Sequence, residues 1–487
     1  MGVAGRQSRF EASRFEQGEE VRVLKFGGTS VEDAAALRRL VAIVKSRMDS
    51  GPVVVVSALA KVTDQLLEAG NAAAHGHLGS ALATVRNIYV RHEGIAGELV
   101  SEAAGHCLGQ ELRQEFQALE ALLHRLDELR RLDLRAQDHL LGFGERLSSR
   151  LVAAALCAGG VEVGHVDAQQ LMVTDARHGQ ANPVWDATNQ RLHEALGPLL
   201  DARRVPVLGG FVAATAEGVP TTLGRGGSDF SAAIVGAALG ASRVEIWTDV
   251  DGIMTADPKL CPDARVIRKM SFDEAAELAQ FGAKVLHPAT LAPARRENIP
   301  VYVLNSRRPE GEGTEISARA RTGNAVNAIT AKRNVAAVEI ESSRGFDAAV
   351  LHAVYEAWDQ HACPVDVMAA SPGRLWLLVE ATAVLPEIVA QLRAVVNVRW
   401  ENHKALVCLV GENLRRQPEV ASRVFAAVAD MEVRVMCQGA SERTISLLVE
   451  ESKAEESVRR LHEVFFGSSR AAARDWGGIS AAFCEAG

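Results

Sequence analysis

The segment Val53 to Ser57 is a short, unbroken run of valines that ends in a serine. Such a run is typical of a strand buried on both faces, as in a parallel sheet covered by helices. Similar strands are predicted elsewhere, separated by segments of helical periodicity: Val21 to Phe26, Val161 to Asp167, Val205 to Val212 and Arg243 to Asp249. This alternation of strands and helices indicates an α/β/α sandwich.

Length and composition limit the class of protein. A chain of 487 residues exceeds one ordinary core, so we expect about two to four domains. The formal net charge of -8 has no basic block, which argues against nucleic acid or an anionic membrane as a partner. The 7 cysteines include no Cys-x-x-Cys pair, so neither a disulfide framework nor a structural zinc site is expected, and no residue is predicted to be a metal ligand. No apolar run reaches about 18 residues, and we predict a cytoplasmic protein.

The predicted strand Val21 to Phe26 runs directly into a glycine turn. The sequence there is Lys25-Phe26-Gly27-Gly28-Thr29-Ser30, and Ser30 is predicted to cap the helix that follows. Glycines let backbone N–H groups approach a phosphate, and the Lys25 ammonium can neutralise a transferring phosphoryl group. The spacing matches neither the P-loop nor the dinucleotide-binding turn. The turn is therefore interpreted as part of a different kind of phosphate site.

A second glycine loop lies in mid-chain, at Thr221-Thr222-Leu223-Gly224-Arg225-Gly226-Gly227-Ser228-Asp229. Arg225 lies between two glycine steps, where its guanidinium can form two hydrogen bonds with a substrate carboxylate. Asp229 precedes a helical pattern from Phe230, so it is either an N-cap or a functional carboxylate. The two loops together predict a site for a polyphosphate and a small anionic substrate.

Three further stretches carry reactive side chains. Glu145 follows the glycine-rich Gly142-Phe143-Gly144 and is predicted either to hold a substrate ammonium or to begin a helix. Thr248 and Asp249 end a predicted strand, and ligands bind at the carboxyl ends of parallel strands. Lys284 supplies a second lysine in a stretch that contains a glycine.

The C-terminal part of the chain has a different organisation. Residues 307–325 are predicted to be a linker rich in Pro, Gly, Glu and Arg. Beyond them, Val365-Asp366-Val367-Met368 is echoed by Val433-Arg434-Val435-Met436 about 70 residues later, which indicates a repeat of two small α/β modules. The second copy lacks a last strand, and 326–333 offers an unassigned strand before the first. We therefore expect the modules to be interleaved.

These motifs resemble those of the aspartokinases, most closely the monofunctional lysine-sensitive type. The resemblance covers Val21 to Gly467 and is carried, in order, by Lys25 to Ser30, Val55 to Ala58 with Val62-Thr63, Gly144-Glu145, Thr221 to Asp229, Ile246 to Asp249 and Phe281 to Thr290. It implies an amino-acid-kinase-like α/β/α sandwich followed by two interleaved ACT-type α/β modules. The implied parts are a flexible leader at 1–20, a catalytic domain at 21–306, a linker at 307–325, a first module at 334–402, a second at 326–333 plus 403–467, and a flexible tail at 468–487.

The resemblance also implies a reaction. ATP, with Mg²⁺, would phosphorylate the side-chain carboxylate of L-aspartate to 4-phospho-L-aspartate, the first step toward lysine, threonine and methionine. A carboxylate with a pKa of about 4 is ionised at neutral pH and needs no general base. The obstacle is its repulsion from the triphosphate, which cations reduce. The implied partners are aspartate, ATP and an amino-acid effector, lysine or threonine, in a homodimer or a dimer of dimers.

Residue roles follow from the resemblance position by position. Catalysis is assigned to Lys25, Asp229 and Lys284, with Asp229 holding Lys25 in place. The substrate pocket would be formed by Ser57, Thr63, Glu145, Phe211, Thr222 and Arg225, with Glu145 on the ammonium and Arg225 on the α-carboxylate. The nucleotide would contact Lys25, Gly27, Gly28, Thr248, Asp249, Met254, Lys259, Lys284 and Val285. The effector site would include Ser343, Phe346, Val365, Asp366 and Ser371.

The sequence also departs from the family pattern. Met254 and Lys259 stand where a tyrosine and an arginine are common, so altered nucleotide affinity is expected. Ala369 and Ala370 replace hydroxyl residues, and fewer hydrogen-bond donors predict weaker effector binding. Two other functions stay open: a kinase of the same fold for glutamate, acetylglutamate or a nucleoside monophosphate, and an inactive ligand-sensing protein. Fusion to homoserine dehydrogenase is not expected, because no further domain is predicted after Gly467.

Overall fold

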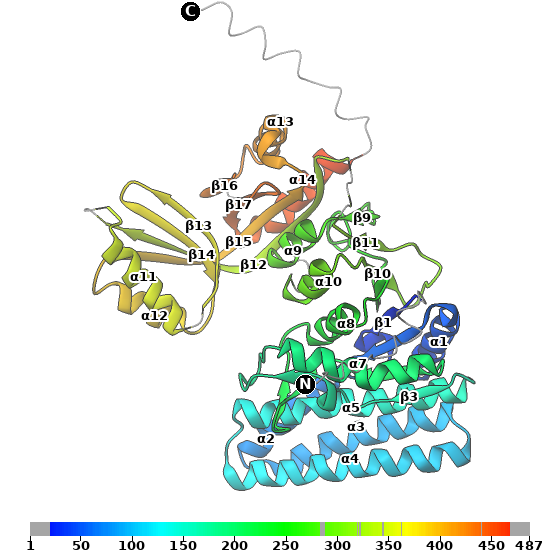
Figure 1. The fold of residues 1–487 in the computed structure, drawn as a ribbon. Helices are drawn as coiled ribbons and strands as arrows, with labels where there is room; N and C mark the ends of the chain where they lie inside the picture. The colour runs from blue at the N-terminus through cyan, green and yellow to red at the C-terminus, as the bar shows by residue number, and fades with distance from the viewer. Residues whose placement is uncertain are drawn as a thin grey trace, which may run out of the picture. The chain divides into compact units, whose positions relative to one another are not determined.

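The computed structural model describes residues 20–282, 288–318, 320, 323–342, 345–361, 363–439 and 441–467 (Figure 1). These residues form two compact units. The first contains the described residues up to Ile253 together with Ala289–Ala320, and the second contains the remainder, beginning with Met254. The segment from Met254 was expected in the catalytic domain. It belongs to the second unit because Ala256 and Cys261 are buried in an apolar core of that unit.

The first unit is built on a mostly parallel sheet. Its strand β1 (Arg22–Phe26) lies between β2 (Pro52–Val56) and β8 (Arg243–Thr248), both parallel to it. All of β2 is buried, as predicted for a valine run covered on both faces. The order within this unit is β3-β5-β2-β1-β8-β10-β11, where the remaining strands are β3 (Val163–His165), β5 (Val205–Gly209), β10 (Val301–Asn305) and β11 (Thr314–Ile316). Strand β11 is antiparallel to β10 and lies in the stretch predicted to be a linker.

Helices cover this sheet. Helix α5 (Leu134–Ala158) packs against β2, β3 and β5, and α8 (Gly227–Ala238) packs against β1, β2 and β8. Beyond α5, Figure 1 shows long helices lying side by side: α2 (Val62–Ala74), α3 (Leu78–Leu99) and α4 (Glu102–Leu129). The other elements are α1 (Ala34–Lys45), α6 (Ala168–Leu171), α7 (Trp185–Asp201), α10 (Ala292–Arg296) and a small sheet of β4 (Val173–Thr174), β6 (Val212–Thr215) and β7 (Pro220–Thr222).

The start of the first helix differs from its prediction. Gly28–Ser30 forms a 3-10 turn, so Ser30 does not cap the helix. Asp33 is the cap, and its Oδ1 accepts the Ala36 N–H at 2.7 Å. The helix therefore begins three residues later than the Ser30 cap predicts.

Helix α5 also differs from the sequence prediction. Glu145 lies in the middle of α5 and does not begin a helix. Gly144 is buried in the same helix, where an added Cβ would lie 2.8 Å from the Ala58 Cβ. The glycine therefore marks a close approach between α5 and the loop after β2, and not a turn.

The second unit is built on an antiparallel sheet of order β13-β14-β12-β15-β17-β16. Its long strands β12 (Val326–Glu341) and β15 (Asn397–Gly411) pair along most of their length. The outer strands are β13 (Val365–Ser371), β14 (Arg374–Glu380), β16 (Val435–Gln438) and β17 (Thr444–Glu450). The other elements are β9 (Lys269–Met270), α9 (Phe272–Gln280), α11 (Ala348–Gln360), α12 (Leu385–Leu392), α13 (Pro418–Ala427) and α14 (Ala454–Phe466).

Two apolar cores share this sheet. Trp358 of α11 belongs to one core, and Leu461 of α14 belongs to the other. Both cores take residues from β12 and β15, so neither half of the sheet is a separate stretch of sequence. Asn334 and His403, at the predicted change-over points, have positive φ values of 58° and 60°. The predicted α/β class is confirmed. Among the described residues, no helix is long and apolar enough to cross a membrane.

Candidate active site

A cation and a carboxylate from the two glycine loops meet at the end of β1. Lys25 is 8% exposed, and its Nζ lies 2.6 Å from Oδ1 of Asp229. Asp229 lies in the first turn of α8, whose N-cap is Gly226, so its side chain is not the cap. The ion pair therefore holds the Lys25 ammonium in one place, and the functional reading of Asp229 is favoured.

The first glycine turn lies against the backbone of its neighbours. The Gly27 N–H donates to the Trp247 carbonyl at 3.0 Å. A Cβ on Gly28 would lie 3.0 Å from the Ala58 carbonyl oxygen and 3.3 Å from the Ala60 nitrogen. A side chain at Gly28 would therefore displace the turn from the loop after β2.

Helix α5 contributes a buried carboxylate. Glu145 is 4% exposed, and its Oε1 accepts the Ala58 N–H at 3.2 Å. Within the part of the chain that the structure describes, Oε2 has no hydrogen-bond partner. Burial raises the pKa of Glu145 to about 8, and the Ala58 N–H and Lys25 only partly oppose it. An unpartnered buried carboxylate oxygen is suited to a cationic ligand group.

The second glycine loop presents an arginine to solvent. Arg225 is exposed, and it forms no ion pair with any residue that the structure describes. Gly224 and Gly226 on either side have φ values of 75° and 71°, a left-handed conformation that favours glycine. Phe211 has a φ of 64° nearby, and its N–H donates to Ser231 Oγ at 2.9 Å.

One cavity of about 410 Å³ joins these side chains. Ser57 follows β2 and Thr63 lies in the first turn of α2, so the cavity is at the carboxyl ends of parallel strands. The predicted residues on its wall are Lys25, Gly28, Ser57, Thr63, Glu145, Phe211, Arg225 and Asp229. Cations and carboxylates thus face one space, an arrangement that can bind a zwitterion together with a phosphate.

Thr222 is close to this cavity but is not on its wall. It is 1% exposed, and its Oγ1 donates to Oδ1 of Asp138 at 2.6 Å. Asp138 also accepts the Gly179 N–H at 3.0 Å and lies 2.8 Å from Nδ1 of His178. In this structure the Thr222 hydroxyl therefore supports the loop and does not face a ligand.

Comparisons with known proteins bear on what this cavity does. The sequence profile of the amino acid kinase family matches residues 20–305, and that of the ACT domain matches residues 407–465. The lysine-sensitive aspartokinase 3 of Escherichia coli (strain K12) is 33% identical over 468 residues, which cover 92% of this chain and 99% of that protein. The chain belongs to the aspartokinase family.

Other aspartokinases are similarly related. The chloroplastic aspartokinase 2 of Arabidopsis thaliana is 33% identical, over 91% of this chain and 84% of that protein. The crystal structure of E. coli aspartokinase III with aspartate and ADP, in the R-state, matches 92% of this chain and 100% of its own, with a TM-score of 0.82 and 33% identity. The same enzyme with lysine and aspartate, in the T-state, gives a TM-score of 0.75. The aspartokinase architecture predicted from the sequence is therefore confirmed.

Two of the nucleotide residues predicted for an aspartokinase lie at the end of β8. Thr248 is the last residue of β8, and its carbonyl accepts the Ser306 hydroxyl at 3.0 Å. Asp249 follows and is exposed. Neither residue is on the wall of the cavity described above.

Four further nucleotide residues of the aspartokinase pattern lie outside the first unit or outside the described residues. Met254 and Lys259 belong to the second unit, where the Lys259 N–H donates to Asp257 Oδ1 at 2.9 Å. Lys284 and Val285 lie outside the described residues. The predicted nucleotide contacts of these four positions stay predictions.

Some residues of the aspartokinase cavity were missed from the sequence. Lys61, Asp64 and Ser228 lie on its wall, and Lys61 has a φ of 71° at the N-cap of α2. They adjoin motif residues, so the motifs give the region but not each side chain. Asp138 was missed as well, although it lies about two helical turns before Glu145 and thus on the same face of α5.

Three of the predicted effector residues, Val365, Asp366 and Ser371, lie in β13 of the second unit. Both oxygens of Asp366 accept Lys332 Nζ, at 2.8 and 2.7 Å. Burial raises the pKa of Asp366, which the Lys332 ammonium opposes. Phe346 and Val365 are partly buried against one core, Ser371 is exposed at the end of β13, and Ser343 lies outside the described residues. A cationic effector at Asp366 would therefore share the carboxylate with Lys332.

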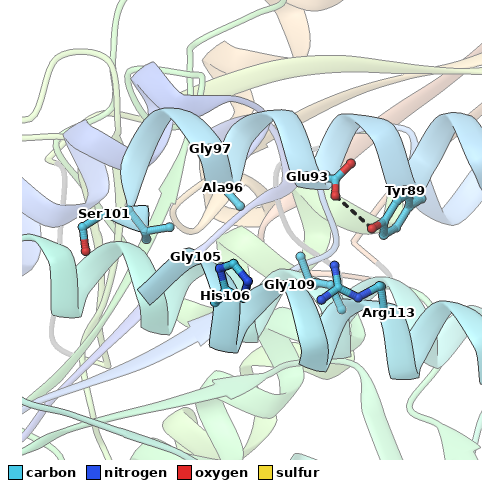
Figure 2. Close-up of a pocket in the computed structure, with 11 residues that line it drawn as sticks. Tyr89, Glu93, Ala96, Gly97, Ser101, Gly105, His106, Gly109 and Arg113 are labelled. Atoms are coloured by element: carbon cyan, nitrogen blue, oxygen red, sulfur yellow. Dashed lines mark hydrogen bonds between the residues drawn. The ribbon is translucent and has the colours of Figure 1, made fainter. Parts of the chain in front are cut away.

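A second cavity of about 410 Å³ lies between α3 and α4 of the aspartokinase chain (Figure 2). Much of its wall consists of glycine and alanine, with Arg113 and His106 on α4. Tyr89 Oη donates to Glu93 Oε1 at 2.9 Å on the α3 side. None of the predicted site residues lines it, and it receives no role in the reaction.

Proposed function

We propose that this protein transfers the γ-phosphoryl group of ATP to the side-chain carboxylate of L-aspartate, giving 4-phospho-L-aspartate and ADP. The observation that carries the proposal is the single cavity that Lys25, Glu145 and Arg225 line together. Membership of the aspartokinase family supports it, as does the similar enzyme solved with aspartate and ADP. The product is the first intermediate toward lysine, threonine and methionine.

Two opposite charges hold the amino acid. Glu145, with its unpartnered Oε2, takes the substrate ammonium, and Arg225 takes the α-carboxylate. Fixing both groups directs the side-chain carboxylate toward Lys25. Ser57, Thr63 and Phe211 line the remainder of the pocket. Glutamate is longer by one methylene, so its carboxylate would reach a different point.

The transfer needs no general base. A side-chain carboxylate oxygen attacks the γ-phosphorus, the bond to the β–γ bridging oxygen breaks, and ADP leaves with the bonding electrons. The barrier is repulsion between two anions. Lys25 Nζ, held at 2.6 Å from Asp229, is placed to offset the charge on the transferring group. Lys284 is proposed as a second cation on the strength of the family resemblance.

Nucleotide contacts complete the proposal. The Gly28 N–H is proposed to face a phosphate oxygen, whereas the Gly27 N–H already donates to the Trp247 carbonyl, so Gly27 contributes through the shape of the turn. Thr248, Asp249, Met254, Lys259 and Val285 are proposed to contact the rest of the nucleotide. Mg²⁺ prefers carboxylate and phosphate oxygens. Asp229 is engaged by Lys25, and the described residues contain no group of three or more candidate metal ligands, so the phosphates of ATP would supply most of the oxygen ligands of Mg²⁺. When bound, Mg²⁺ lowers the negative charge of the β- and γ-phosphates.

A product assay tests the function. Purified protein is incubated with Mg-ATP and either aspartate or glutamate, ADP release is followed with a coupled assay, and acyl phosphate is trapped with hydroxylamine. We expect the hydroxamate with aspartate and not with glutamate. Turnover of glutamate alone would favour another kinase of this fold. No acyl phosphate with either acid would favour a ligand-sensing protein.

We also propose feedback control through the second unit. Two ACT-type modules are assigned: the first is residues 334–402, and the second is residues 326–333 with 403–467. The proposed effector is lysine or threonine. Leu351, Tyr355 and Met368 are 45%, 69% and 57% exposed, and pairing of first modules between subunits would cover them. A homodimer or a dimer of dimers is expected by light scattering, measured with and without lysine.

A further inference from the structure

Asp138 is a charged residue inside the first unit that the proposed mechanism does not use. It is 1% exposed and lies on α5, about two helical turns before Glu145. A buried carboxylate is costly unless donors satisfy it. The groups that meet Asp138 are such donors: the Thr222 hydroxyl at 2.6 Å, the Gly179 N–H at 3.0 Å and Nδ1 of His178 at 2.8 Å.

These donors come from two separate segments of the chain. Thr222 ends β7, directly before the glycine loop, and Gly179 and His178 lie in the loop before α7. The two segments also contact each other, because the Ala181 N–H donates to the Thr222 carbonyl at 2.9 Å. Asp138 therefore joins both segments to α5.

The glycine loop rests on this anchored layer. A Cβ on Gly224 would lie 3.2 Å from the Gly179 carbonyl oxygen and 3.1 Å from Gln180 Cγ, so the loop packs tightly on the segment that Asp138 holds. Arg225 is the next residue and lies on the cavity wall. Since Arg225 is exposed and has no ion-pair partner among the described residues, the backbone of this loop determines where its guanidinium can reach.

We propose that Asp138 is a positioning residue that sets Arg225 for the substrate α-carboxylate. The inference rests on the aspartate kinase activity proposed above and adds a residue to it. Helix α5 then serves the pocket twice: Glu145 binds the ammonium directly, and Asp138 fixes the loop that binds the carboxylate. The distance between the Glu145 carboxylate and the Arg225 guanidinium is therefore determined by one rigid helix.

The principal test is Asp138→Asn, which keeps the shape and replaces one acceptor oxygen with a donor NH₂. That NH₂ would face a hydroxyl, an N–H or Nδ1, all of which donate to Asp138 in this structure. We expect the KM for aspartate to rise about tenfold, with kcat and the KM for ATP within about twofold. The matched control is Asp133→Asn at the N-cap of the same helix, where aspartate kinetics should not change.

A double-mutant cycle separates positioning from a general loss of structure. If Asp138 acts through Arg225, Asp138→Asn should change the KM for aspartate by less than about twofold in an Arg225→Ala background. Full multiplication of the two effects would overturn the proposal. His178→Leu should raise the KM for aspartate. His178→Asn keeps a hydrogen-bond donor near the position of Nδ1, so its KM should be close to that of the unmodified protein.

Failure of this inference differs from failure of the proposed function. Aspartate binding to the full chain is measured by calorimetry beside turnover, so Asp138→Asn has a readout that does not need catalysis. If the unmodified protein phosphorylates aspartate and Asp138→Asn binds it equally well, the positioning role is wrong and the function stands. If the unmodified protein gives no acyl phosphate, the proposed function is wrong. The ratio of the aspartate dissociation constants of Asp138→Asn and the unmodified protein still tests whether Asp138 positions the glycine loop.

Discussion

Lys25 and Asp229 form a buried ion pair in which Nζ and Oδ1 are 2.6 Å apart, although Lys25 lies in β1 and Asp229 lies in the first turn of α8. The side chains are only 9% and 13% exposed, so solvent screens the pair weakly. An ammonium held in this way need not reorganise when charge develops on a transferring phosphoryl group.

Replacing Lys25 with alanine should act mainly on kcat. The ammonium is assigned to charge that is greatest during transfer, so we expect kcat to fall roughly 100-fold or more, with little change in the KM for aspartate. Coupled ADP release measures both constants. Lys45→Ala, an exposed lysine at the end of α1, is the control. A normal kcat with a raised KM would reverse the assigned role.

Replacing Arg225 with alanine should act mainly on the KM for aspartate. Loss of the Arg225 guanidinium removes a charge-assisted hydrogen bond to the substrate α-carboxylate, so we expect the KM to rise about 10- to 100-fold. Arg113→Ala is a matched control, because Arg113 lines the separate groove between α3 and α4. An equal effect of both substitutions would contradict a specific role for Arg225.

Aspartate binding should depend on pH through Glu145. Its pKa of about 8 means that the free protein holds a proton there at pH 7, whereas a substrate ammonium requires the ionised carboxylate. Binding should therefore release a proton, and affinity should rise by up to about tenfold per pH unit from pH 6 to 8. Calorimetry in buffers of different ionisation enthalpy counts the proton. Glu145→Gln should abolish this release.

The same carboxyl group should affect unfolding in the absence of ligand. Between its ordinary pKa of 4.5 and about 8, the folded state keeps the Glu145 proton and the unfolded state loses it. The unfolded state then binds fewer protons, so the free energy of unfolding falls as the pH rises through this interval. As the pH rises from 5 to 8, the melting temperature of the Glu145→Gln variant should fall less steeply than that of the unmodified protein. Identical slopes would argue against the raised pKa.

Two glycine-to-alanine substitutions should have opposite effects on stability. A Cβ on Gly210 would lie 2.6 Å from the Ser228 Cα, so Gly210→Ala should lower the free energy of unfolding by about 1–3 kcal/mol. Gly94 lies within α3 with no atom near an added Cβ, so Gly94→Ala should raise it by about 0.5–1 kcal/mol. Urea titration of both variants and of the unmodified protein measures the two changes in the free energy of unfolding.

Effector binding should improve when a hydroxyl returns to β13. Ala370 is exposed in β13, and Ala370→Ser adds a donor for an effector carboxylate. About 1 kcal/mol from one hydrogen bond would lower the half-inhibitory lysine concentration about fivefold. Inhibition curves with lysine and with threonine measure the shift. An unchanged curve for both amino acids would place the effector away from Ala370.

Sequence reasoning located most of the cavity because its chemistry is local. Lys25 and Gly28 sit in one short motif, and Arg225 and Asp229 sit in another, with glycines marking where the backbone must approach a partner. The sheet follows from valine-rich strands alternating with helical patterns. A short motif therefore predicts the residues that it contains.

Long-range packing could not be predicted in this way. Asp138 carries no local motif, and its donors, such as Thr222, come from distant segments. The predicted catalytic domain, 21–306, agrees with the family match to residues 20–305, but the compact units divide the chain at Met254. The burial of Ala256 and Cys261 beside Leu461 causes this division, and no local pattern predicts it. The polar-rich stretch 307–325, predicted to be a linker, supplies strand β11, which pairs with β10.

The continuity of β12 and β15 has a practical result for anyone dissecting the regulatory half. A fragment cut near residue 333 or 402 divides a strand in the interior of the sheet and leaves its backbone N–H and C=O groups without neighbours. Expression of either half alone should yield aggregates. Separate domains for effector titration should therefore keep both long strands whole.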